Sequence, residues 1–110
     1  MSYKISATPT FKKDLKKLAK KHLSLKQDFS KLLASLQKSP TQGTALGNSC
    51  YKIRLAISSK GKGKSGGGRV ITYFQVTKST IWLLAIYDKS DRATISDKEL
   101  KKRLKDIIDG

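Results

Sequence analysis

Acidic residues are scarce in this chain. Its 110 residues include 24 Lys and Arg but only 8 Asp and Glu, so the formal net charge is +16. No acidic residue lies between Asp28 and Asp88, although nine Lys and Arg fall in that interval. A small domain stays soluble with a net charge of only about 2–8, and a larger charge destabilises a compact domain through self-repulsion. The excess of positive charge therefore predicts a polyanionic partner that is held through its phosphate groups.

Cysteine, histidine and long apolar runs are scarce as well. The only cysteine, Cys50, excludes an intrachain disulfide, which fits a reducing compartment. With one His, one Cys and no acidic residue near the basic segments, we expect no metal site and no other cofactor. The N-terminus lacks an apolar signal stretch and no run could span a bilayer, so we expect a cytoplasmic protein without a membrane partner. The length fits one domain, residues 1–110.

The N-terminal half has the pattern of a strand followed by two helices. Residues 3–6 alternate in polarity as a short strand does, and Thr8 and Pro9 then begin a helix as its N-cap and first helical residue. The capping-box pattern of residues 24–27 begins a second helix. Residues 41–49 are polar and are expected to form a loop.

The C-terminal half has the pattern of three strands followed by a helix. Alternating or continuous apolar runs predict strands at residues 51–57, 69–76 and 81–87. A second capping box at residues 96–99 begins an amphipathic helix. The predicted fold is therefore α+β with the order β-α-α-β-β-β-α, in which the two N-terminal helices pack on a small, mainly antiparallel sheet.

Basic residues are placed regularly on two of the predicted strands. Lys52 and Arg54 alternate with apolar residues, so they share one face of the strand at residues 51–57. Arg69 opens the strand at residues 69–76. If the two strands pair as a hairpin, the three cations lie on neighbouring strands of one sheet.

The loop between these strands, residues 58–68, contains five glycines and three lysines. Gly63-Lys64-Ser65 is similar to the end of a phosphate-binding P-loop. That motif needs a glycine where Ser58 stands, however, and it opens a helix rather than a strand. We therefore expect either an ordinary solvated hairpin or a loop that brings its lysines, Lys60, Lys62 and Lys64, close to phosphates.

Cleavage of RNA is a reaction that basic residues can carry. The 2′-hydroxyl must lose a proton, the phosphate must be stabilised, and the departing 5′-oxygen must gain a proton. Lys and Arg stabilise phosphate directly, and a lysine crowded by other cations has a lowered pKa and can act as acid or base near pH 7. Tyr73, if it shares the face of these cations, can stack on a base.

Three segments resemble the RelE/ParE toxin superfamily: residues 51–55 (YKIRL), 61–71 (GKGKSGGGRVI) and 83–96 (LLAIYDKSDRATIS). The Lys-Gly-Lys loop is most similar to the HigB branch of that superfamily, and the resemblance covers nearly the whole chain. It implies a type II toxin that cuts messenger RNA on the ribosome without a metal. It also implies a cognate antitoxin protein that binds and silences the toxin.

The resemblance further implies roles for single residues. Lys52 and Arg54 fall on the positions that activate and orient the 2′-hydroxyl, and Arg69 falls on the arginine that holds the scissile phosphate. Lys89 best matches a further basic residue after the last strand, with Arg92 as its neighbour. The loop lysines are assigned to docking on ribosomal RNA.

One position departs from the family. The family's tyrosine before the C-terminal helix falls near Ile95 in this chain. Tyr73 and Tyr87 are the alternatives for such a role, although neither is aligned with that position.

Two other functions stay open at this point. A ParE-like inhibitor of DNA gyrase would share the superfamily fold without being an enzyme, and it would have no need of a phosphate-cleaving cluster. A non-catalytic module that binds nucleic acid would show strongly salt-dependent binding and no cleavage.

Overall fold

The computed structural model describes residues 3–61, 66–92 and 94–108. Its main elements follow one another as β1 (Lys4–Ala7), α1 (Pro9–Lys21), α2 (Leu25–Lys38), β2 (Thr44–Gly47), β3 (Cys50–Leu55), β4 (Gly68–Gln75), β5 (Thr80–Asp88) and α4 (Asp97–Ile108). The 3-10 turns η1 (Ser58–Lys60) and η2 (Val76–Lys78) follow β3 and β4. The α+β class and the predicted order are confirmed, and β2 is an addition to them. None of the described helices is long and apolar enough to cross a membrane.

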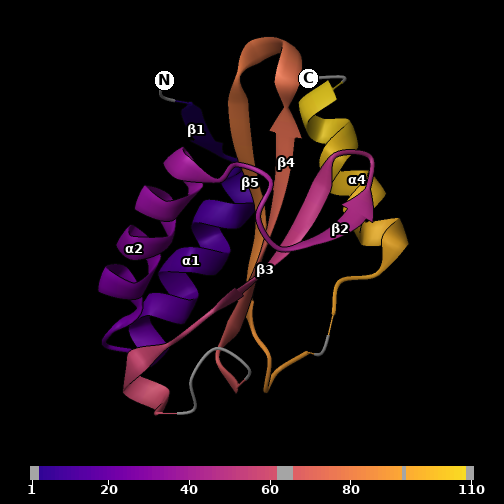
Figure 1. The fold of residues 1–110 in the computed structure, drawn as a ribbon. Helices are drawn as coiled ribbons and strands as arrows, with labels where there is room; N and C mark the ends of the chain where they lie inside the picture. Colours follow the sequence, from indigo (N-terminus) through magenta and orange to yellow (C-terminus); the bar gives the residue numbers. More distant parts are fainter. Residues whose placement is uncertain (1–2, 62–65, 93, 109–110) are drawn as a thin grey trace.

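The strands of the described chain form one mixed sheet in the order β1-β5-β4-β3-β2. β1 runs parallel to β5, and the other three neighbouring pairs are antiparallel. Helices cover both faces of β5, α1 and α2 on one side and α4 on the other, which explains why its sequence is apolar on both faces. Figure 1 shows α1 and α2 on one side of this sheet and α4 on the other.

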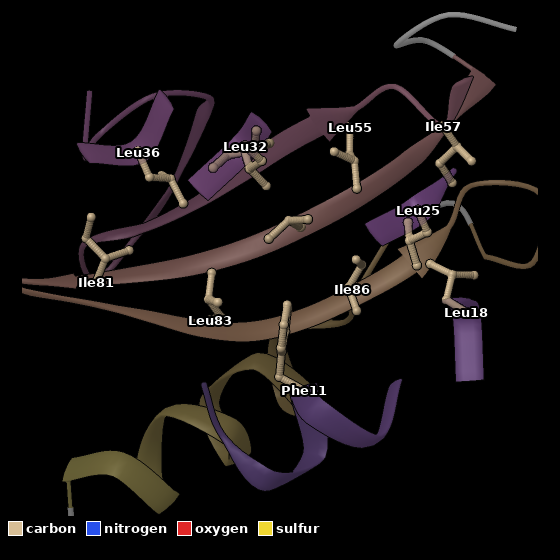
Figure 2. Packing of buried hydrophobic residues seen from close by; sticks show 12 residues of the cluster. Phe11, Leu18, Leu25, Leu32, Leu36, Leu55, Ile57, Ile81, Leu83 and Ile86 are labelled. Atoms are coloured by element: carbon tan, nitrogen blue, oxygen red, sulfur yellow. The ribbon is translucent and has the colours of Figure 1, made fainter. Parts of the chain in front are cut away.

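The first core lies between the sheet and helices α1 and α2. Thr8 caps α1 as predicted, because its hydroxyl accepts a hydrogen bond from the N–H of Phe11 at 3.1 Å, and Pro9 occupies the first turn. Apolar residues of both helices meet alternate residues of the strands, because residues three or four apart share a helix face and alternate residues share a sheet face. Figure 2 shows this packing, which includes Phe11, Leu18, Leu25, Leu32, Leu36, Leu55, Ile57, Ile81, Leu83 and Ile86.

The second core lies on the opposite face of the sheet, under α4. The predicted cap of this helix is confirmed, since the N–H of Glu99 donates to the hydroxyl of Ser96 at 3.1 Å. Leu100 and Leu104 of α4 are buried there. Their cluster also contains the buried residues Cys50, Ile71, Leu84, Ala85, Tyr87 and Ile95.

The structure corrects the prediction of a loop at residues 41–49, because Thr44–Gly47 forms the edge strand β2. This strand pairs with β3 through its backbone and is mostly exposed, so it lacks the apolar alternation that reveals a strand. The chain turns from β2 into β3 through Asn48 and Ser49, which both have positive φ. Asparagine in such a two-residue turn is the sequence signal that would have indicated the hairpin.

The first predicted capping box is also wrong. Ser24 precedes α2, but its hydroxyl does not cap the helix. The hydroxyl donates to Asp28 at 2.7 Å and accepts from the N–H of Ser59 at 2.8 Å. Asp28 in turn accepts hydrogen bonds from the N–H and the hydroxyl of Ser58, at 2.9 and 2.6 Å. A tertiary contact between α2 and η1 therefore replaces the local cap.

β5 contains a bulge that α4 stabilises. Thr72 of β4 pairs with Leu83 and Ile71 pairs with Ala85, so Leu84 is an extra residue on β5. The carbonyl of Leu84 accepts a hydrogen bond from Nη1 of Arg103 at 2.6 Å. A guanidinium from α4 thus satisfies a buried carbonyl at the bulge.

Asp88, at the end of β5, binds groups from three separate elements. Its carboxylate lies 2.8 Å from Nε2 of His22 and 2.6 Å from Nζ of Lys60, and it accepts from the N–H of Ser90 at 2.9 Å. Only 2% of the Asp88 side chain is exposed. Burial alone would raise the pKa of this carboxyl, but the hydrogen bonds outweigh burial and hold the pKa well below its usual range. His22 is thus a structural partner that ties the end of α1 to β5.

The first prediction concerns this buried carboxylate. Asp88→Asn should lower the free energy of unfolding by about 3 kcal/mol, because the buried ammonium of Lys60 loses its counter-charge. Because the folded pKa of Asp88 is lowered, its stabilisation is present at neutral pH and is lost as the pH falls below about 4. The variant should therefore lose less stability than the wild type between pH 7 and pH 3, as measured by urea unfolding.

Asp91→Asn is the matched control, because Asp91 pairs with Lys21 on the surface. It should change stability by less than about 0.5 kcal/mol. Equal effects of the two variants would contradict the structural role of Asp88.

Candidate nucleic-acid interface

Strand pairing places two arginines and a tyrosine in one row across the sheet. Arg54 of β3 lies directly opposite Arg69 of β4, and Arg69 lies directly opposite Tyr87 of β5. Side chains at directly paired positions have Cβ atoms about 5 Å apart. This row, Arg54–Arg69–Tyr87, lies on the face of the sheet that carries α4, at the end of the sheet where β3 and β5 finish and β4 begins.

Lys52 lies on the same face of β3 as Arg54, two residues earlier in the strand. It lies opposite Ile71 of β4, which is a member of the second core. Its Nζ is 3.5 Å from the hydroxyl of Thr94, in the segment that leads into α4. The sheet register therefore places Lys52, Arg54 and Arg69 on one face, as the sequence pattern predicted.

The arginines of the row face each other as like charges. Arg54 is exposed, whereas Arg69 is only 7% exposed and donates from Nη1 to the carbonyl of Gly68 at 2.9 Å. Among the residues that the structure describes, no ion pair involves Lys52 or Arg54. Like charges at directly opposed positions destabilise a sheet, so an anion bound between them would relieve their repulsion.

Arg92 covers the other end of the row. Its Cζ lies 5.1 Å from the centroid of the Tyr87 ring, a cation–π geometry. Its Nη2 is 2.8 Å from Oε1 of Glu99, at the start of α4. Arg92 thus joins the basic face next to Arg69 and Lys52, held there by an aromatic ring and a carboxylate.

Tyr87 places a buried phenol in the row. Its side chain is 7% exposed, and among the described residues its hydroxyl has no hydrogen-bond partner of good geometry. Burial raises the pKa of Tyr87, and Thr94 and Arg92 beside it offset part of that rise. The phenol therefore stays protonated at neutral pH.

The other predicted site residues occupy different places. Lys89 is exposed after β5, and its N–H donates to the carbonyl of Gly67 at 3.1 Å, which places it close to the start of β4. Tyr73 shares the face of Arg69, but it lies four residues further along β4, about 13 Å away. Ile95 is buried in the second core, where it contributes packing.

The loop lysines divide into two groups. Lys60 is 11% exposed and its ammonium binds Asp88 and the hydroxyl of Ser90, at 2.6 and 2.9 Å. Contact between Lys60 and ribosomal RNA would require that ion pair to break. Lys62 and Lys64, and with them the rejected P-loop motif, lie outside the described residues.

Gly67 has a role that the sequence reading missed. A Cβ atom at this position would collide with the carbonyl oxygen of Leu55 and would lie 3.0 Å from the backbone N of Ile57. The loop therefore returns to the sheet with its backbone in close contact with the end of β3. This contact, together with the hydrogen bond from Lys89, sets where Arg69 enters the row.

In the part of the chain that the structure describes, no three His, Cys, Asp or Glu side chains are grouped as a metal site requires. The groups that can act chemically on this face are cations and a phenol. Such a set can bind and polarise a phosphate and can exchange protons with it.

Two helices on one face of a mixed sheet and one helix on the other is a fold that this chain shares with solved structures of RelE toxins. The E. coli toxin RelE, as a free double mutant, is 20% identical with a TM-score of 0.66, covering 97% of this chain and 99% of that chain. A chain of the intact E. coli RelBE toxin–antitoxin complex is 20% identical with a TM-score of 0.62, and the match covers 79% of this chain and 96% of that chain. A chain of the RelBE2 toxin–antitoxin complex of Mycobacterium tuberculosis is 16% identical with a TM-score of 0.57, and the match covers 83% of this chain and 95% of that chain.

The sequence itself matches the family model described as the RelE toxin of the RelE/RelB toxin–antitoxin system over residues 8–107. The chain therefore belongs to the RelE toxin family. Its resemblance to the HigB branch stays a prediction.

The second prediction tests the close approach at Gly67. Gly67→Ala should lower the free energy of unfolding by about 2–3 kcal/mol, because the added methyl overpacks the end of β3. Gly61→Ala is the control, since it has open space around it but a φ of +69°, and it should cost about 1 kcal/mol. Urea unfolding measures both, and a smaller loss for Gly67→Ala than for Gly61→Ala would contradict the close contact.

The third prediction tests the opposed arginines. Arg54→Ala should leave stability unchanged or raise it by up to about 0.5 kcal/mol, because it removes the like charge opposite Arg69. The same variant should gain less thermal stabilisation than the wild type from a short 2′-deoxy oligonucleotide.

Lys38→Ala removes an exposed charge at the end of α2 and should keep the wild-type response to the oligonucleotide. Melting curves of the wild type and both variants, with and without the oligonucleotide, measure these responses. An unchanged response of the Arg54 variant would exclude the row as an anion site.

Proposed function

We propose that this chain is the toxin of a type II toxin–antitoxin system and that it is a ribosome-dependent endoribonuclease. The observation that carries the proposal is the pairing of Arg54 with Arg69, with Lys52 on the same face of β3. Membership of the RelE toxin family supports it. Arg54, Arg69 and Lys52 place two guanidiniums and an amine on one face of the sheet, and such groups bind the non-bridging oxygens of a phosphodiester.

The proposed reaction is an internal transfer at phosphorus. The 2′-oxygen attacks the adjacent phosphate, the bond from phosphorus to the 5′-oxygen breaks, and the RNA ends as a cyclic 2′,3′-phosphate and a 5′-hydroxyl. Arg54 would orient the 2′-hydroxyl, Lys52 would take up its proton, and Arg69 would hold the non-bridging oxygens as charge develops on them. Lys89, which is tied to the start of β4 through Gly67, would return a proton to the 5′-oxygen.

The surroundings of the row suit a substrate held by its backbone. Arg92 would add a phosphate contact beside Arg69. Lys62 and Lys64 of the glycine-rich loop would dock on ribosomal RNA, and Tyr73 would offer a ring for stacking further along the strand. In this proposal the messenger RNA is cut while the ribosome presents it.

The proposal includes an antitoxin. The relatives in two of the solved structures are toxins bound to their antitoxins. We infer that this toxin too is silenced by a partner protein, and that acidic groups on the partner are drawn to a chain of net charge +16.

The fourth prediction tests the function in cells. Induced expression of the wild type should arrest growth and produce new transcript 5′ ends that follow the reading frame and disappear when translation is blocked. Arg69→Ala should abolish both effects, because it removes the main phosphate ligand, while circular dichroism shows an unchanged fold. Lys38→Ala should remain fully toxic.

Other outcomes would point elsewhere. Intact transcripts with broken chromosomal DNA would indicate a gyrase inhibitor of the ParE type. Growth arrest without any cleavage, together with salt-sensitive RNA binding, would indicate a non-catalytic binding module. A folded and fully toxic Arg69→Ala variant would rule out the proposed reaction centre.

A further inference from the structure

At the edge of the sheet, β3 continues beyond its partner β2. β2 pairs with Cys50, Tyr51 and Lys52, and on this side no other described strand pairs with β3. Figure 1 shows β2 beside only one end of β3. A pocket of about 220 Å³ lies past the end of β2, between α2 and the last residues of β3. Pockets that enclose a drug-sized ligand measure roughly 300–1,000 Å³, so this smaller one suits a single planar ring system.

Arg54 belongs both to the basic row and to the lining of this pocket. On one side it faces Arg69 across the sheet, and on the other it lies past the last pair of β2 with β3, which is at Lys52. Its side chain is exposed. A phosphate in the row and a group in the pocket would therefore contact the same guanidinium, so one ligand can supply both.

The loop before β2 places an amide of fixed orientation in the pocket. Nε2 of Gln42 donates to the hydroxyl of Ser35 at 2.6 Å and to the carbonyl of Ser39 at 3.1 Å. Because a carbonyl only accepts hydrogen bonds, the bond to Ser39 identifies the amide nitrogen and leaves the amide oxygen, Oε1, as an acceptor. Gly43 holds the loop against β3, since a Cβ atom there would lie 2.5 Å from the carbonyl oxygen of Lys52.

The rest of the lining combines apolar walls with a second acceptor. The apolar residues are Leu32, Leu55 and Ala56. Lys31 is exposed at the rim, and Asp28 contributes a buried carboxylate. This carboxylate accepts three hydrogen bonds from Ser24 and Ser58, and an ionised carboxylate offers about four acceptor sites. A carboxylate repels a second phosphate, so the pocket differs from the cationic row and suits a neutral group that donates hydrogen bonds.

We propose that this pocket receives the base of a nucleotide adjacent to the phosphate in the row, and that it selects a base with an exocyclic amino group, such as adenine or cytosine. The amino group would donate to Oε1 of Gln42, and the guanidinium plane of Arg54 would stack on the base. Uracil fits less well, because its N3–H lies between two carbonyl oxygens, which would face the carboxylate of Asp28. This base selection rests on the proposed function, since RNA is the nucleic acid that would bring the base.

The fifth prediction compares two oligonucleotides that differ in this amino group. The purified wild type should bind a labelled pentamer of 2′-deoxycytidine about fivefold or more tightly than a pentamer of 2′-deoxyuridine, as measured by fluorescence anisotropy. Neither pentamer has a 2′-hydroxyl, so binding is measured without cleavage. Gln42→Leu keeps the size of the side chain and removes the acceptor. It should reduce the preference to less than about twofold by weakening binding of the cytidine pentamer alone.

Gln27→Leu is the matched control, because Gln27 is exposed on α2 and is not among the residues that line the pocket. It should keep the wild-type preference. Ser35→Ala is a second test, since it removes one of the two acceptors that hold the amide of Gln42. It should reduce the preference and leave binding of the uridine pentamer unchanged. Circular dichroism confirms that all variants fold.

Three results would overturn the proposal. Equal affinity of the wild type for the two pentamers would mean that the pocket selects no base. A preference that Gln42→Leu retains would mean that another part of the protein makes the selection. Failure of the wild type to bind either pentamer would exclude both the pocket and the row as sites for nucleic acid.

The anisotropy measurement does not depend on RNA cleavage or on the ribosome, so the two proposals fail separately. Growth arrest and transcript cleavage by the wild type, together with equal affinity for the two pentamers, would remove the pocket proposal alone. A preference that depends on Gln42, without arrest or cleavage, would remove the proposed function alone.

Discussion

The pairing register of β3, β4 and β5 is the constraint on which both the core and the basic site depend. Because side chains alternate across a strand, a slip of one residue would turn Ile53, Leu55 and Val70 away from the helices. The same slip would bury Arg54 under α2. Hydrophobic burial on one face therefore enforces the alignment of Arg54, Arg69 and Tyr87 on the other. The repulsion between the two arginines is small beside the apolar area that the register buries, so the fold can hold them together.

Three of the carboxylates in the described chain join separate elements of the fold. Asp28 binds the turn after β3, Asp88 joins the end of α1 to the beginning of the glycine-rich loop, and Glu99 links α4 to Arg92. The pKa of Asp28 and of Asp88 is lowered although burial opposes it, because hydrogen bonds to the charged form outweigh burial. These three acids are thus engaged within the fold and add little negative charge to the surface that a polyanion would meet.

Much of the fold was readable from local sequence. The Thr8–Pro9 start of α1, the Ser96 cap of α4 and the β-branched runs of β4 and β5 are local signals, and each appears where it was predicted. The alternation of Lys52 and Arg54 placed both cations on one strand face. β2 escaped prediction because an edge strand that pairs only through its backbone needs no apolar pattern. Ser24 was misjudged because a contact with η1, distant in sequence, competed with the local cap.

By itself the sequence determined the charge of this protein, its class of fold and the strands that carry its cations, because composition and periodicity are local properties. Only the tertiary structure decided that Arg69 faces both Arg54 and Tyr87, that Lys60 is engaged with Asp88, and that a pocket lies beside Arg54 where β2 ends. Each of these depends on register or on contacts between segments far apart in the chain. Such contacts are selected by the joint burial of apolar surface and the pairing of buried charge, and no single segment of the sequence contains that information.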